Sequence, residues 1–68
     1  MRWTEQHDRV AQVHVRTHYS SSTDEQMVDY MVGLYPELDR ETVRMHVRFW
    51  VVYYLDVRGE EQEQEDIG

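Results

Sequence analysis

Residues 10–19 alternate between small or β-branched side chains and long hydrogen-bonding ones, and this alternation predicts a β-strand. Successive side chains of a strand point to opposite faces. One face would carry Ala11, Val13, Val15 and Thr17, and the other would carry Gln12, His14, Arg16 and His18. The second set contains no acid, and long donors and acceptors of this kind can reach base edges in a DNA groove. The pattern therefore predicts a strand with one anchored face and one binding face.

A helix over the same residues is the alternative interpretation. Five residues at helical spacing would then lie near one face, namely Trp3, His7, Val10, His14 and His18. Residues 12–16 would form a turn of an amphipathic helix, and the chain would be an all-α three-helix bundle. The sequence leaves both interpretations open, and each assigns different residues to a binding surface.

Residues 24–35 are predicted to form a helix. Ser22 and Thr23 can each cap its first turn, and each precedes a Glu or Gln by the three residues of a capping box. The apolar positions at helical spacing are Met27, Val28, Met31 and Leu34. Pro36 should end the helix, because proline disfavours the helical conformation at the residue before it.

A second, longer helix is predicted over residues 40–57, with Asp39 as its cap and Gly59 as its end. The same run also alternates as a strand would, but it exceeds the usual strand length and no turn signal interrupts it. Apart from a narrow polar stripe, the helix is apolar on nearly all sides, and such helices are buried. In so short a chain, this surface implies a homodimer. The expected dimer core comprises Val13, Val15, Val47, Phe49, Trp50 and Tyr54.

The charge of the chain is unevenly distributed. The 68 residues carry a formal net charge of −7, and five of the fourteen acidic residues lie in the last nine positions. We expect an N-terminal arm at residues 1–9, a folded domain at 10–58 and a disordered acidic tail at 59–68. The tail is a candidate contact for a protein partner. All seven basic residues are arginines, a composition typical of a salt-adapted (halophilic) or high-GC source.

The composition disfavours several classes of protein. There is no cysteine, and the longest apolar run, residues 49–55, is too short to span a membrane, so a cytoplasmic protein is expected. No pairing of nucleophile and base, phosphate-binding glycine loop or catalytic carboxylate pair can be assembled, so we expect neither an enzyme nor a cofactor. His14 and His18 would stand about 13 Å apart on a strand. On a helix their four-residue spacing is common for metal ligands, but no Cys or carboxylate is placed beside them. Solvated or stacked histidines are therefore expected, and no metal.

The order strand, helix, short turn and longer helix resembles the ribbon-helix-helix repressors over about residues 10–57. This resemblance implies an intertwined dimer whose paired strands enter the major groove of double-stranded DNA. The matching base-contact positions are Gln12, His14 and Arg16. The start of the second helix lies against phosphate in this family, which makes Arg40, Thr42 and Arg44 the phosphate contacts.

The predicted function is therefore that of a small dimeric DNA-binding repressor. If residues 10–19 are helical, the helices at 24–35 and 40–57 could instead form a helix-turn-helix that contacts DNA through Arg40, Arg44 and Arg48. The alternative class is an acidic interaction module or inhibitor that occupies the basic site of another protein.

Overall fold

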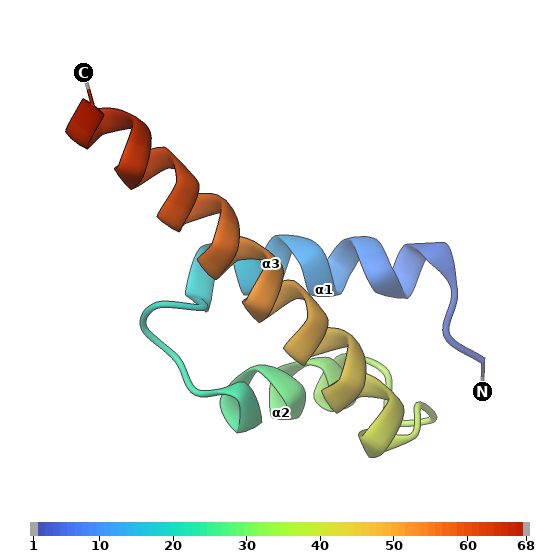
Figure 1. The fold of residues 1–68 in the computed structure, drawn as a ribbon. Coiled ribbons are helices and arrows are strands. Elements are labelled where there is room, and N and C mark those ends of the chain that lie inside the picture. The colour runs from blue at the N-terminus through green and yellow to red at the C-terminus, as the bar shows by residue number, and fades with distance from the viewer. Residues whose placement is uncertain (1, 68) are drawn as a thin grey trace.

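A computed structural model describes the backbone of residues 2–67 and the side chains of residues 2–57. The chain forms three helices, α1 (Glu5–His18), α2 (Asp24–Leu34) and α3 (Arg40–Ile67). In Figure 1, α3 crosses in front of α1 and α2. It packs on both of them, whereas α1 and α2 contact each other less. The chain is thus mainly helical, as the all-α alternative requires.

The predicted strand at residues 10–19 is wrong, because residues 10–18 belong to α1 and Tyr19 caps its carboxyl end. Thr4 begins the helix with a capping box: its hydroxyl accepts from the His7 backbone N–H, and His7 Nδ1 accepts from the Thr4 N–H. Ala11 and Val15 are fully buried, but Val13 between them is 59% exposed. Burial therefore follows the helical repeat and not the alternation. Residues 2–67 contain no strand, so the chain cannot form a ribbon-helix-helix dimer.

α2 confirms the helix predicted at residues 24–35 to within one residue. Thr23 and Gln26 form the capping box: Gln26 Oε1 accepts from the Thr23 N–H at 2.9 Å, and Thr23 Oγ1 accepts from the Gln26 N–H at 3.2 Å. The buried residues of this helix are Met27, Val28 and Met31. Leu34 was expected to share their face, but it is 49% exposed at the carboxyl end of the helix.

α3 begins at Arg40, directly after Asp39, as predicted. Its backbone continues to Ile67 and thus runs past Gly59, the predicted end. Residues 43–57 are helical, so the alternative of a strand there is wrong. The expected disordered tail, residues 59–68, lies beyond the residues whose side chains the structure describes, and its disorder stays a prediction.

The hydrophobic core lies between α3 and the pair α1 and α2. It consists of Ala11, Val15, Met27, Val28, Met31, Leu38, Val43, Val47 and Val51. Trp50 and Tyr54 pack against this core from the flank of α3. The large apolar residues of α3 that point away from it are exposed.

Candidate interaction surfaces

The three predicted base-contact residues do not form a row on α1. A helix turns by about 100° per residue, so Gln12 and Arg16 share one face while His14 lies about 200° from Gln12. Arg16 is exposed, whereas Gln12 and His14 are half-buried. The arrangement needed to read successive base edges depended on a two-residue repeat, and the helix removes it.

The predicted dimer-core residues separate into three groups. Val15 and Val47 are fully buried within the single chain. Trp50 and Tyr54 are half-buried against that core. Only the other two, Val13 and Phe49, are strongly exposed, and they lie on different helices.

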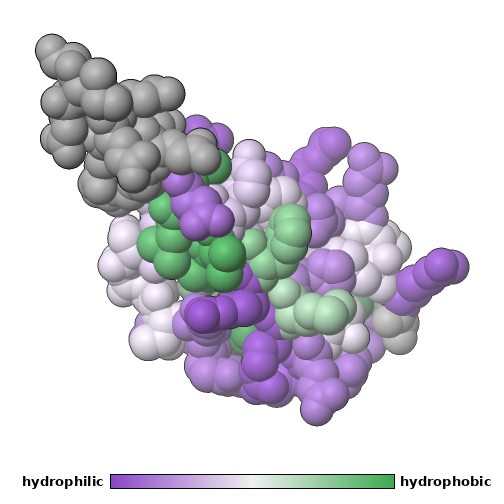
Figure 2. Space-filling view, in the orientation of Figure 1, coloured by the Kyte–Doolittle hydropathy of each residue, from purple (hydrophilic) through white to green (hydrophobic). Residues whose placement is uncertain are grey.

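An exposed apolar surface runs along α3 on the side away from the core. We call it the outer stripe, and its members are Met45, Phe49, Val52 and Tyr53, which are 63%, 60%, 44% and 46% exposed. Leu55, 55% exposed, lies beside it. In Figure 2, hydrophobic surface covers the middle of α3 and is bordered by hydrophilic residues. α3 is therefore apolar on two opposite sides, and the chain itself covers only one.

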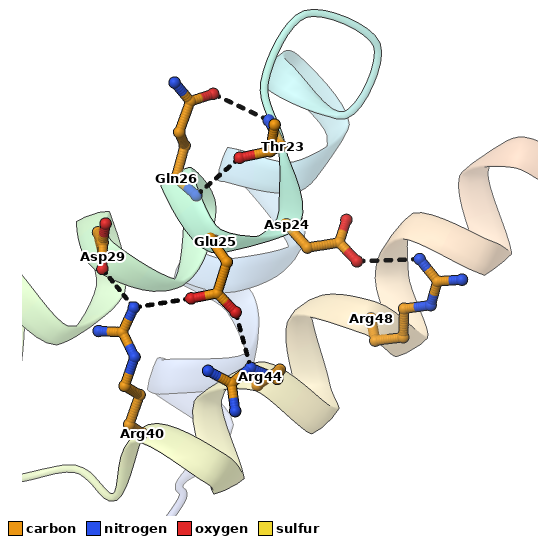
Figure 3. Close-up of polar contacts among 8 residues, drawn as sticks. All are labelled: Thr23, Asp24, Glu25, Gln26, Asp29, Arg40, Arg44 and Arg48. Carbon is orange, nitrogen blue, oxygen red and sulfur yellow. Dashed lines mark hydrogen bonds and ion pairs between the residues drawn. The ribbon is translucent and has the colours of Figure 1, made fainter.

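Acidic residues of α2 face arginines of α3 along the line where the two helices pack. We call this set the acid–arginine ladder, and it comprises Asp24, Glu25, Asp29, Arg40, Arg44 and Arg48 (Figure 3). Glu25 accepts from Arg40 and from Arg44 Nε, each at 2.9 Å. Arg40 also donates to Asp29 at 2.5 Å. The ladder lines the solvent-exposed edge of the contact between α2 and α3.

The remaining predicted phosphate contacts are also engaged within the chain. Thr42 Oγ1 donates to Asp39 Oδ2 at 3.4 Å. Arg48, the third arginine of the helix-turn-helix alternative, donates to Asp24 at 2.9 Å. These guanidinium groups are exposed, but each would have to exchange a carboxylate for a DNA phosphate. The sequence identified the arginine stripe but not its acidic partners, because they lie on a different helix.

The ladder shifts the pKa values of its members. Hydrogen bonds from Arg44 and then Arg40 lower the pKa of Glu25, because they favour the charged carboxylate. Hydrogen bonds to Asp29 and Glu25 raise the pKa of Arg40 for the same reason. These side chains are solvent-exposed, so water and salt screen the interaction. The ladder thus contributes orientation more than stability.

An aromatic cluster joins the N-terminal residues to α3. The indole of Trp3 stacks on the His46 ring with centroids 4.1 Å apart. Asp8 Oδ1 accepts from Trp50 Nε1 at 3.1 Å and from Trp3 Nε1 at 3.4 Å. Sequence reasoning treated residues 1–9 as a polar arm and missed this cluster. The available signal was the presence of both tryptophans in so short a chain.

A second surface feature lies between α1 and α2. It is an open cavity of about 370 Å³, lined by Arg9, Val10, Val13, His14, Thr17, His18 and Tyr30. His14 stacks flat on Tyr30, with ring centroids 3.9 Å apart and an interplanar angle of 2°. Its pKa is lowered, first by partial burial and then by repulsion from His18.

The described residues hold no larger cluster of metal-ligating side chains and no membrane-spanning helix. No cluster of three or more His, Cys, Asp or Glu side chains suited to a metal occurs among them. None of the helices, over their described residues, has the length and apolar character needed to cross a membrane. Protein-family models, curated proteins and solved structures were compared with the chain, and none of them matches it.

Proposed function

We propose that the chain is a small acidic protein-interaction module that works as a homodimer. The observation that carries this proposal is the outer stripe of α3, with side chains 44–63% exposed on the side opposite the core. Burying apolar surface is favourable by about 25 cal/mol per Å². A helix that is apolar on two sides therefore gains from a second covering surface, and residues 2–67 contain no further helix to supply it.

The spacing of the outer stripe suits a helix as the covering element. Met45, Phe49 and Val52 follow one another at intervals of four and three residues, the spacing of a coiled-coil seam. A second copy presents the same seam on its own α3, so two copies can pair through one two-fold interface. Arg48 is the one Asp, Glu, Lys or Arg between Met45 and Tyr53, and its guanidinium donates to Asp24 of α2.

DNA binding, the function predicted first, has less support. The residues predicted to contact bases from a strand lie on the helix α1, and the three candidate arginines of α3 form ion pairs with α2. The net charge of −7 opposes approach to a polyanion. Repression through DNA therefore stays a prediction that the experiment below also tests.

Sedimentation equilibrium can test the dimer directly. The wild-type chain should sediment as a dimer, and Phe49→Gln should shift it toward the monomer because it places an amide in the centre of the stripe. Val13→Gln is the matched control, since Val13 is equally exposed but lies on α1. It should leave the dimer intact. A monomeric wild-type chain would refute the proposal, as would dissociation by Val13→Gln and not by Phe49→Gln.

The dependence on salt distinguishes the competing functions. Two copies with a net charge of −7 repel each other, so added salt should strengthen the homodimer by screening. Binding to a labelled DNA duplex would weaken with salt, because phosphate contacts release counterions. Fluorescence anisotropy with that duplex at low salt should show no binding, and saturable binding would favour the repressor instead.

A further inference from the structure

His14 and His18 lie on consecutive turns of α1, with their ring centroids 4.5 Å apart and their planes tilted by 44°. The expectation that no metal binds rested in part on a strand, which would hold the two rings about 13 Å apart. The helix removes that objection. Two histidines four residues apart in a helix face the same side, so both can offer a ring nitrogen to one ion.

The two rings are close enough together to bind one metal ion. A metal–imidazole bond is about 2.0–2.1 Å long and the ring centre lies about 1.1 Å further, so the ion stands about 3.2 Å from each centroid. Two rings bound at a right angle then have centroids about 4.5 Å apart, and at a tetrahedral angle about 5.2 Å apart. The observed 4.5 Å is short enough for both rings to reach one ion.

Tyr30 orients one of the two ligands without blocking it. The tyrosine ring lies flat on the face of the His14 ring. A metal binds to imidazole in the plane of the ring, through a nitrogen lone pair, so the stack leaves the coordinating edge free. The stack also restricts rotation of His14, which lowers the cost of ordering this ligand on binding.

The surroundings leave room for the other ligands of an ion. The open cavity of about 370 Å³ beside the two rings can hold several water molecules. Two imidazoles are fewer than the three protein ligands of a typical catalytic zinc site. The described residues add no third His, Cys, Asp or Glu to the pair. The remaining positions therefore belong to water.

We propose that His14 and His18 form a binding site for a divalent transition-metal ion, with Cu²⁺ and Ni²⁺ favoured over Zn²⁺. Cu²⁺ and Ni²⁺ accept two imidazoles with water in the remaining square-planar or octahedral positions, whereas Zn²⁺ sites in proteins are usually tetrahedral with three or four protein ligands. The site lies between α1 and α2, away from the outer stripe of α3. Loss of one surface therefore leaves the other in place.

Calorimetric titration of the tag-free chain with NiCl₂ tests the site. The wild-type chain should bind one Ni²⁺, and His14→Gln and His18→Gln should each weaken binding at least tenfold. His46→Gln is the matched control, because His46 stacks on Trp3 away from the cavity. It should bind Ni²⁺ as the wild type does. Equal binding by all four proteins would overturn the proposal, and so would tighter binding of Zn²⁺ than of Ni²⁺.

A second measurement guards against misfolded variants. Circular dichroism should give the same helical signal for each variant as for the wild type. In NMR spectra of the wild-type chain, Cu²⁺, which is paramagnetic in square-planar and octahedral coordination alike, should broaden the ring signals of His14 and His18 before those of His7 and His46. Broadening that begins at His7 or His46 would place the ion elsewhere and refute the assignment.

Discussion

Asp8 illustrates how single side chains hold this small molecule together. One of its carboxylate oxygens accepts hydrogen bonds from the indoles of Trp3 and Trp50, which are 47 residues apart in the sequence. The same oxygen lies 3.9 Å from His46 Nδ1. A single acid in the first turns of α1 thus connects the N-terminal residues, α1 and α3.

At the same scale, Glu25 should make stability depend on pH. Its pKa in the folded chain lies below its ordinary value of 4.5, so the folded state favours the charged carboxylate. This contribution is fully present above pH 4.5 and is lost as the pH falls through the folded pKa. We expect Glu25→Gln to lower the melting temperature slightly at pH 7 and to leave it unchanged at pH 2.

Glu37→Gln provides the control for that measurement. Glu37 is an exposed glutamate in the turn between α2 and α3, outside the acid–arginine ladder, and its replacement changes the net charge equally. Its melting temperature at pH 7 should match that of the wild type. Equal effects of the two substitutions would mean that overall charge, and not the ladder, determines this pH dependence.

At the scale of elements, the capping boxes decide where helices begin. Thr23→Ala should destabilise the chain by about 1 kcal/mol, because it leaves the first turn of α2 without its side-chain acceptor. Thr17→Ala is the matched control, since the Thr17 hydroxyl donates to the Val13 carbonyl inside α1 and caps nothing. Urea unfolding of both variants measures the difference. A loss at Thr17 as large as that at Thr23 would contradict the capping argument.

The elements also show which parts of the fold the sequence could predict. α2 and the start of α3 were predicted correctly, because a cap and a proline mark their ends. α1 was ambiguous, because Ala11 and Val15 are four residues apart, a spacing that satisfies both the strand and the helix repeat. Val13 distinguishes the two repeats, but its 59% exposure depends on packing with α2 and α3. The Thr4–His7 box was the missed local signal, since histidine replaces the usual Glu or Gln.

For the whole molecule, the sequence indicated excess apolar surface on α3 but not its position. Which side of α3 remains uncovered depends on how α1 and α2 dock, and that docking joins residues far apart in the sequence. The acid–arginine ladder was hidden for the same reason. The sequence shows that His14 and His18 are four residues apart, but the distance between their rings depends on whether the segment is a strand or a helix.

Removal of residues 59–68 tests the role of net charge in assembly. The deletion takes away five acids and no arginine, so the charge changes from −7 to −2. If two copies associate against their mutual repulsion, the shortened chain should dimerise more tightly at low salt and respond less to added salt. Sedimentation at low and high salt compares the two chains. A weaker dimer of the shortened chain would show that the deleted residues contribute contacts.

The aromatic cluster has a practical consequence for spectroscopy. Both tryptophans of the chain lie in it, and Trp50 is in edge contact with Phe49 of the outer stripe. Tryptophan emission therefore reports on the aromatic cluster alone, whereas far-ultraviolet circular dichroism averages over every helix. Recording both signals during thermal unfolding would show whether the aromatic cluster loses its contacts before the helices unfold.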